Sequence, residues 1–437
     1  MSHKASHPTD PSTFSDEELD ALQATTLRYY VHEFNAATGL VRDKTQEGAP
    51  ASIAAVGMAL STSPLVAERG IRTRALQAAR VLKTLRFFAN SRQGTEPDAT
   101  GYKGFYYHFL DMETGRRVWN CELSTVDSAF LFAGMLVVAT YFDHDDADET
   151  EIRRLAQHLY ERADWNWARD GGASVTHGWR PEAGFIPFRW TGYDEALLLY
   201  VLGLGSPSNP LPEESYAAYT ATYHWKQVCD QEYLYSGPLF THQLSHMWVD
   251  FRGIQDSFMR EHGIDYFENS RRATYAQQYY AIRNPMQFEG YGEFSWGFTA
   301  SDGPGWTTVK IRGVERPFFD YIARGAPFGP DDGTIAPWAA VASLPFAPEI
   351  VLPTIKHCEK LDLLLHDSYG FKATFNRTFP VEESDRFWVS PYHFGIDQGP
   401  IALMIENYRS GLIWDLMRRC EPIRAGLRRA GFRGGWL

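Results

Sequence analysis

Residues 189–205 read RWTGYDEALLLYVLGLG and place two adjacent carboxylates, Asp194 and Glu195, at the start of an almost entirely apolar helix. Such a helix is expected to be buried on most of its circumference. Asp and Glu are seldom buried without a partner or a function. Glu195 stands beside Trp190 and Tyr193, where loss of water raises the pKa of a carboxyl group. The helix dipole alone also explains an acid at a helix N-terminus, so both interpretations are open at this point.

Composition narrows the class of protein. The 437 residues, 44% of them hydrophobic, suffice for one large core or two fused domains. A net charge of -12 argues against nucleic acid or an anionic membrane as partner. Aromatic residues make up 15% of the chain, and many lie in Gly- and Pro-rich loops beside polar side chains. A large core accounts for part of this content, whereas a carbohydrate site needs flat rings next to hydrogen-bonding groups.

Cysteine usage and the N-terminus bear on the compartment. The four cysteines are far apart and form no CxxC motif, so neither a zinc site nor a disulfide scaffold is expected. The first residues contain no apolar segment typical of a signal peptide, and no apolar run is long enough to cross a bilayer. We therefore expect a cytoplasmic protein, or a periplasmic one if a leader was removed.

Helical patterns recur along the chain, separated by long loops. Ser15 and Glu18 form a predicted capping box with a Phe14/Leu19 staple. Helices are expected over 15–34, 52–60, 71–88, 125–141, 149–165, 193–204, 214–225, 265–282, 347–365 and 398–419, and strands only in places such as 104–110 and 307–312. The pattern predicts an all-α fold in which paired helices close into one barrel-like domain over 16–437, after a disordered or extended lead-in over 1–15. An α-solenoid is the competing arrangement, but no repeat of fixed period is visible.

Two further acids precede apolar helices. Asp127 follows Ser124 by three residues, which is ordinary N-cap spacing, so Asp127 is either a capping acid, a substrate ligand or both. Asp397 stands in GIDQGPIALM, again just before an apolar run. In a helical toroid the N-termini of alternate helices lie at one end, which would bring Asp127, Glu195 and Asp397 together. Two opposed carboxylates suffice for glycoside hydrolysis, with inversion or retention decided by their separation.

Other loops contribute candidate substrate ligands. His242 and His246 have the spacing of a helical metal site, but no Glu follows His242 and Gly-Pro precedes the segment, so hydrogen bonding is expected and neither metal nor cofactor. The loop 290–306 presents Glu293 and Asp302 beside Trp296. Turns imposed by its glycines and proline make it an ordered aromatic loop suited to a sugar subsite. Arg252 either contacts substrate or neutralises nearby acids.

Several long motifs resemble one family. They are WTGYDEALLLYVLGLGSP at 190–207, GPLFTHQLSHMWVDFRGIQD at 237–256, DYFENSRRAT at 265–274, WGFTASDG at 296–303, DDGTIAP at 331–337 and GIDQGPIALMIENY at 395–408. These motifs are similar to the bacterial glucoamylase-like family, which includes the endo-β-1,2-glucanases of glycoside hydrolase family 144 and the glucoamylase-like region of cyclic β-1,2-glucan synthases. The resemblance extends from residue 105 to residue 414, nearly the whole chain.

The resemblance implies an (α/α)6 barrel that acts on β-1,2-linked glucans without a metal. It assigns Glu195 as general acid, Asp397 as general base and Asp127 as the acid of a Ser-Thr-Val-Asp pattern. Ser124 stands where the family pattern has another acid, and Glu122 is a candidate substitute. An inverting hydrolase of β-linked gluco-oligosaccharides is therefore the first hypothesis, with no nucleic acid or membrane partner and no prediction of oligomeric state. A retaining or transglycosylating enzyme with Glu293 as nucleophile, and a non-catalytic glycan-binding protein, are the alternatives.

Overall fold

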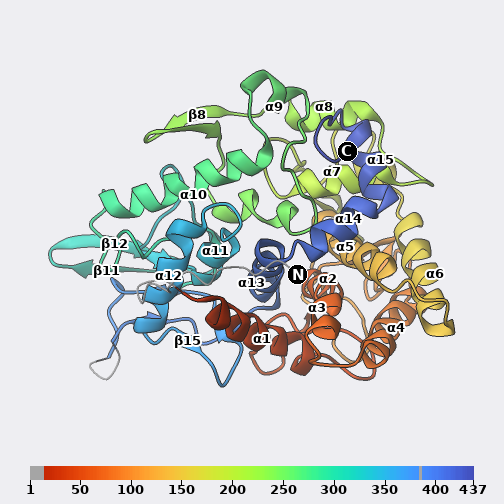
Figure 1. The fold of residues 1–437 in the computed structure, drawn as a ribbon, viewed down its shortest axis with the longest axis horizontal. Helices are drawn as coiled ribbons and strands as arrows, with labels where there is room; N and C mark the ends of the chain where they lie inside the picture. Colours follow the sequence, from red (N-terminus) through yellow and green to blue (C-terminus); the bar gives the residue numbers. More distant parts are fainter. Residues whose placement is uncertain (1–13, 383–385) are drawn as a thin grey trace, which may run out of the picture.

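The computed structural model describes residues 14–382 and 386–437 and is rich in helices (Figure 1). The longer helices are α1 (Asp16–His32), α2 (Ile53–Ser61), α4 (Arg74–Asn90), α5 (Thr125–Tyr141), α6 (Ala147–Glu161), α7 (Ala196–Gly205), α8 (Glu213–Thr220), α10 (Tyr266–Arg283), α12 (Pro348–Lys360), α13 (Gly395–Arg409), α14 (Leu412–Arg419) and α15 (Glu421–Arg429). Shorter turns of helix are α3 (Ser63–Glu68), α9 (Ser257–His262), α11 (Pro337–Ala342), η1 (Trp167–Arg169), η2 (Leu239–His242) and η3 (Leu244–Met247). The helix-rich prediction is confirmed.

Local sequence signals account for several helix ends. The predicted capping box at Ser15 and Glu18 is present at the start of α1. Helix α5 has the predicted bounds, and it begins at Thr125 because Ser124 caps it, its side chain accepting the backbone N–H of Asp127. The helix predicted over 398–419 is instead two helices, because Gly411 at the break has φ 72°. The prediction of an extended lead-in over 1–15 falls almost wholly outside the described residues.

Short strands form among the loops, where the all-α prediction is incomplete. One sheet has the order β2-β3-β5-β6-β7, formed by Gly101–Tyr102, Phe105–Tyr107, Leu123–Ser124, Gly178–Arg180 and Gly184–Phe185. Small antiparallel units pair β1 (Ala51–Ser52) with β4 (Phe109–Leu110), β8 (Trp225–Val228) with β9 (Gln231–Leu234), β10 (Ala300–Ser301) with β13 (Ile322–Ala323), β11 (Thr307–Ile311) with β12 (Val314–Phe318), and β15 (Leu364–Leu365) with β16 (Gly370–Phe371). A three-stranded unit has the order β14-β17-β18, from Thr334–Ile335, Phe375–Asn376 and Trp388–Val389. Runs this short carry too little alternation to be recognised in a sequence.

The core lies where apolar helices contact one another. Every residue of α7 is buried, as its composition predicts, and α5 is buried along nearly its whole length. Helix α2 packs on α5, α5 packs on α7, and α13 packs on both α2 and α11. Gly57 and Gly134 allow the closest of these approaches, since a Cβ on Gly134 would stand 2.3 Å from the Gly57 carbonyl oxygen. The outer helices α1, α6 and α12 cover this layer, lying against α13, α5 and α11 respectively.

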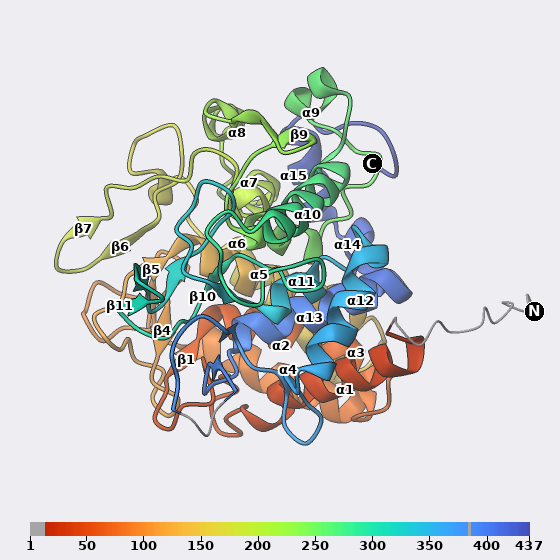
Figure 2. The ribbon, with the colours of Figure 1, turned by 90° about the vertical axis from the view of Figure 1, so that its left-hand side faces the viewer.

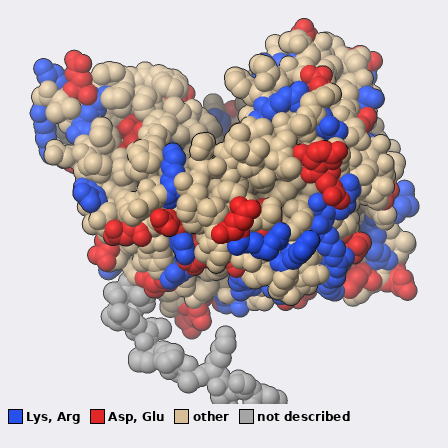
Figure 3. Space-filling view, turned by 90° about the horizontal axis from the view of Figure 1, so that it is seen from above, with Lys and Arg blue, Asp and Glu red and all other residues tan. Residues whose placement is uncertain are grey.

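Several of the short strands lie together on one side of the helices. Figure 2 shows β1, β4, β5, β6, β7, β10 and β11 together at the left of the view. Strand β5 runs directly into α5, so the start of that helix lies on this side. Figure 3 shows a notch between two lobes of the surface at the upper edge of the view. Within the described residues, no helix is both long and apolar enough to span a membrane.

Candidate active site

Glu195 immediately precedes α7, but it does not cap that helix. Its side chain makes no capping hydrogen bond, whereas the Asp194 Oδ1 accepts the Ala196 N–H at 3.0 Å. The Ser245 hydroxyl fixes the local backbone by accepting the Leu198 N–H and donating to the Glu195 carbonyl oxygen. The capping role thus belongs to Asp194, and the carboxyl group of Glu195 is available for chemistry.

The surroundings of Glu195 favour its protonated form. Burial is the main cause, and the negative charge of Asp127 adds to it, so that the pKa of Glu195 is raised to about 7. Burial and the neighbouring charge of Glu195 also raise the pKa of Asp194 well above its usual range. A carboxyl group with a pKa near neutrality can hold a proton and release it, as a general acid must.

Asp127 lies in the first turn of α5 and contacts the cap of that helix. It is the third residue of α5, and the Ser124 hydroxyl both accepts its backbone N–H at 3.2 Å and donates to its Oδ2 at 2.5 Å. The His108 Nε2 lies 3.7 Å from the same Oδ2. Ser124 therefore provides a hydrogen bond to Asp127 at the position where the family pattern has another acid.

His108 lies between two carboxylates, and sequence reasoning missed it. Its Nδ1 is 3.0 Å from the Glu122 Oε1. Burial lowers the pKa of His108, but Asp127 and Glu122 outweigh burial and raise it to about 9. The hydrogen bond from His108 lowers the pKa of Glu122 to about 2, with a further contribution from Arg180. A single histidine in a short strand segment carries no sequence signal for this role.

Asp397 lies on the other side of the group, in the first turn of α13. It is only 5% exposed, and among the groups of the described residues that perturb it there is no cation. Burial, followed by the charges of Asp43 and Asp302, raises its pKa well above the usual range. Asp302 is held by the Ser390 hydroxyl, which donates to its Oδ2 at 2.6 Å.

Asp43 links the two sides and was also missed by sequence reasoning. Its carbonyl oxygen accepts the Gly395 N–H at 2.7 Å, which ties it to the start of α13. Burial is the main cause that raises the pKa of Asp43 to about 6, with His108 and Lys44 lowering it and Asp127 raising it. Asp43 lies in a loop well before the start of α2 at Ile53, so its sequence context did not resemble that of the acids that directly precede or begin a helix.

Tyr321 shows that these carboxylates face one region. Burial of its hydroxyl group and the charges of Asp397, Asp43, Asp127 and Glu195 together raise the pKa of Tyr321 far above its usual range. Its ring is nevertheless 53% exposed, so the residue reaches inward from the surface. The pairing of Ser301 with Ile322 places Tyr321 next to Asp302. The structure thus brings together Asp127, Glu195, Asp302 and Asp397 from the predicted set, joined by Glu122 through His108.

The predicted aromatic and histidine ligands lie deeper. Trp190 is 8% exposed, donates its Nε1–H to the Thr125 hydroxyl and stacks 3.8 Å from His177. Tyr193 packs against Tyr266 and His242, and burial lowers the pKa of His242 to about 4. These residues pack beneath the segment that carries Glu195, on its side toward the core. Other protein atoms already cover their rings.

Four residues that the sequence predicted to bind substrate do not lie beside the carboxylates. The ring of His246 lies among Phe251, Phe267 and Phe346, and Trp296 is fully buried. Glu293 is exposed, and its backbone carbonyl oxygen accepts a hydrogen bond from the side chain of Gln278 on α10. Arg252 binds Asp250 and covers Trp414, just past the end of α13 opposite to Asp397.

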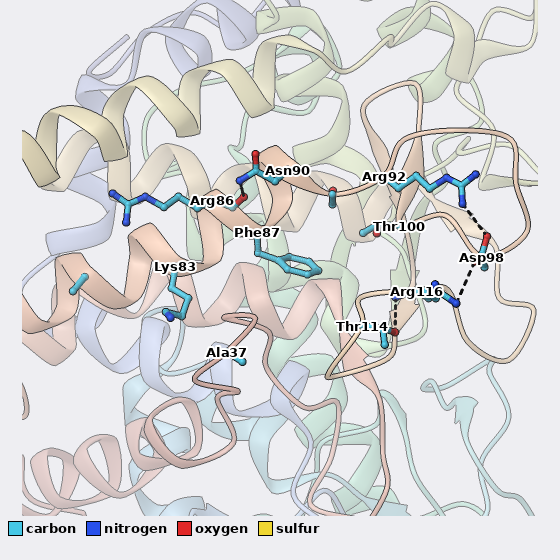
Figure 4. A pocket seen from close by; sticks show the side chains of 12 residues that line it. Ala37, Lys83, Arg86, Phe87, Asn90, Arg92, Asp98, Thr100, Thr114 and Arg116 are labelled. Atoms are coloured by element: carbon cyan, nitrogen blue, oxygen red, sulfur yellow. Dashed lines mark hydrogen bonds and ion pairs between the residues drawn. The ribbon is translucent and has the colours of Figure 1, made fainter.

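A separate pocket of about 550 Å³ lies on α4 and the neighbouring loops (Figure 4). Arg92 and Arg116 in its wall are paired with Asp98, and Arg86 is paired with Glu151. Asp98 is its single acidic wall residue, so the pocket lacks the carboxylate pair that glycoside hydrolysis needs.

Comparison with known proteins identifies the family of the segment that carries Glu195 and Asp397. The family model described as "Putative glucoamylase" matches residues 187–421, which is more than half of the chain. The chain belongs to this glucoamylase-like family. A crystal structure from Bacteroides uniformis with the same description is 32% identical, covers 97% of this chain and 99% of its own, and superposes with a TM-score of 0.85.

Two relatives in the glucoamylase-like group have named substrates. An endo-β-1,2-glucanase from Chitinophaga pinensis, solved with sophorotriose and glucose, is 26% identical over 97% of this chain and 99% of its own, with a TM-score of 0.83. An exo-β-1,2-glucooligosaccharide sophorohydrolase from Parabacteroides distasonis is 28% identical over 98% of this chain. The chain spans only 59% of the length of that relative.

Proposed function

We propose that this protein is a glycoside hydrolase of β-1,2-linked gluco-oligosaccharides, with Glu195 as general acid and Asp397 as general base. The observation that carries the proposal is a carboxyl group of pKa about 7, not engaged in capping its helix, that belongs to a convergent group of acids. The two relatives named for β-1,2-glucan cleavage support the choice of linkage.

The reaction that we propose is a single displacement. Glu195 donates its proton to the glycosidic oxygen as the bond from that oxygen to the anomeric carbon breaks. Asp397 accepts a proton from a water molecule, whose oxygen forms the new bond to the anomeric carbon from the opposite face. Because its surroundings raise its pKa, Asp397 binds a proton more strongly than an ordinary aspartate and is the stronger base once ionised. The product has inverted configuration.

We further propose that residues 16–437 form one (α/α)6-barrel domain. An inner layer of α2, α5, α7, the η2–η3 segment, α11 and α13 supports this, because neighbouring members contact one another and Gln243 donates to the Ala339 carbonyl oxygen. Helices α1, α6, α15, α10 and α12 each lie against one of these inner elements. In such a toroid the starts of α5, α7 and α13 share one end, which is where the acids converge.

The test is a screen of the purified protein against defined α- and β-linked gluco-oligosaccharides. We expect sugar release from β-1,2-linked substrates, with the α anomer appearing first in proton NMR spectra. Initial release of the β anomer would replace the single displacement by a retaining mechanism. Cleavage of α-1,4-linked substrates alone would contradict the linkage, and binding of β-1,2-linked oligosaccharides without cleavage would make the protein a glycan-binding protein.

A further inference from the structure

Trp119 occupies an unusual backbone position in the turn between β4 and β5. The Cys121 N–H donates to the Val118 carbonyl oxygen at 3.1 Å and closes this turn. Both central residues have positive φ, 58° at Trp119 and 49° at Asn120. Gly, Asn and Asp usually supply this conformation, and a bulky residue rarely does. The indole ring is also 64% exposed, so packing of the core does not explain why a tryptophan stands there.

A row of rings connects Trp119 to the carboxylate group. Its indole ring lies 5.1 Å from the ring of Phe109, and Phe109 stacks on His108 at 4.0 Å with an interplanar angle of 12°. His108 in turn contacts Glu122 and lies 3.7 Å from Asp127. Phe109 and His108 are both partly exposed. A row of adjacent rings therefore leads from the exposed indole through Phe109 to His108, which contacts the acids.

Polar groups accompany this row. The Arg180 Nη2 lies 3.5 Å from the Glu122 Oε2, and the side chains of Arg180 and Glu122 are 46% and 25% exposed. A pyranose ring presents apolar C–H groups on its faces and hydroxyl groups on its edge. The exposed indole and the partly exposed Arg180–Glu122 pair, which are linked through Phe109 and His108, match both kinds of surface. Aromatic rings bury apolar area and charged groups form the stronger hydrogen bonds.

We propose that Trp119 is the stacking platform of a distal subsite, which binds a glucosyl residue of the substrate away from the bond that is cleaved. Arg180 and Glu122 bind the hydroxyl groups of that residue. This inference rests on the proposed function, because a distal subsite has meaning only for an oligosaccharide that is cleaved at the carboxylates. The strained turn keeps the indole at the surface, facing the substrate rather than the core.

A chain-length series tests the subsite. With Trp119→Ala we expect kcat/KM for the longer β-1,2-linked oligosaccharides to fall about threefold to tenfold, mainly through KM, because one stacked ring is lost. The shortest substrate cleaved should keep its kcat and KM, and Trp119→Phe should recover most of the loss. Tyr408→Ala is the matched control, since this partly exposed ring lies eleven residues beyond Asp397 on α13 and should affect no substrate.

The outcomes separate this inference from the proposed function. If the parent protein cleaves no β-1,2-linked oligosaccharide, the proposed function fails. If the parent cleaves them and Trp119→Ala is unchanged at every length, or loses activity equally at every length, the distal subsite is wrong. Calorimetric titration of Glu195→Gln with and without Trp119→Ala gives a binding readout without turnover. There too, only the longer oligosaccharides should lose affinity.

Discussion

Helix α13 carries a buried carboxylate near each end, and the pKa values of the two groups are shifted in opposite directions. Asp397 in the first turn is 5% exposed and Glu406 near the last turn is 7% exposed. Burial raises the pKa of both. At Glu406, hydrogen bonds from Ser410 and Arg69 outweigh burial, and the pKa is lowered. At Asp397 the neighbours are Asp43 and Asp302, and the pKa is raised well above its usual range.

The difference teaches that the partner, and not burial, distinguishes a structural carboxylate from a reactive one. Glu406 also accepts a hydrogen bond from the amide of Gln23, so it joins α13 to α1. Asp250 repeats the structural pattern, because Arg252 and Arg418 both bind its carboxylate. Among the residues that the structure describes, no such cation acts on Glu195 or Asp397, and the charges nearest to them are those of other acids. Strongly perturbed carboxyl groups without structural partners are the ones expected to do chemistry.

The largest effect is expected at Glu195. Glu195→Gln removes the proton donor and should lower kcat/KM on a β-1,2-linked oligosaccharide by about a thousandfold. The melting temperature should not fall, because glutamine resembles the protonated form that the site favours. An unchanged rate would show that another group protonates the leaving oxygen.

A paired substitution on α13 tests the comparison itself. Asp397→Asn should lower kcat/KM by about a hundredfold or more without loss of stability, because asparagine resembles the protonated form that burial and the neighbouring acids favour. Glu406→Gln should leave the rate nearly unchanged and lower the free energy of unfolding by about 1–3 kcal/mol, because Arg69 loses one of its two charged partners and keeps only Asp20. Urea denaturation and initial rates measure both quantities. If the two variants exchanged these results, the interpretation of both ends would be reversed.

Substitution of Tyr321 tests the surroundings of Asp397, the reactive one of the two carboxylates on α13. The charges of four carboxylates raise the pKa of its hydroxyl group, so the hydroxyl keeps its proton and can donate a hydrogen bond to a substrate oxygen. Tyr321→Phe should reduce kcat/KM by about tenfold, in keeping with the loss of one hydrogen bond. Equal rates for the variant and the parent would show that the Tyr321 hydroxyl group takes no part in the reaction.

The smallest effect is expected at Glu293, which is exposed on the loop beside α10. Glu293→Gln should change neither the rate nor the melting temperature measurably, since surface substitutions away from a site are usually near neutral. A large loss of activity in this variant, together with retention of anomeric configuration, would favour the alternative in which Glu293 is the nucleophile.

The sequence predicted the long helices and the acids that begin them because both have periodic or capping signals. Helix α5 shows this, with Ser124 as cap and an apolar run behind it. The same signals cannot show which acid caps, so the division of roles between Asp194 and Glu195 needed the structure. Asp43, His108 and Tyr321 come from loops and very short strands, and only tertiary contacts reveal that they face the same region. Trp296, His246 and Arg252 have suitable chemistry in the sequence but lie in the core or at the other end of α13.

The dependence of kcat/KM on pH tests the central claim most directly. Because the pKa of Glu195 is raised above its ordinary value, the proton needed for catalysis is bound below about pH 7 and is lost as the pH rises through that value. We predict an alkaline limb near pH 7 for the parent protein, measured on a β-1,2-linked oligosaccharide. The limb should be absent from the residual activity of Glu195→Gln. A rate that stays constant up to pH 9, or an alkaline limb that persists in Glu195→Gln, would contradict the assignment of Glu195 as the general acid.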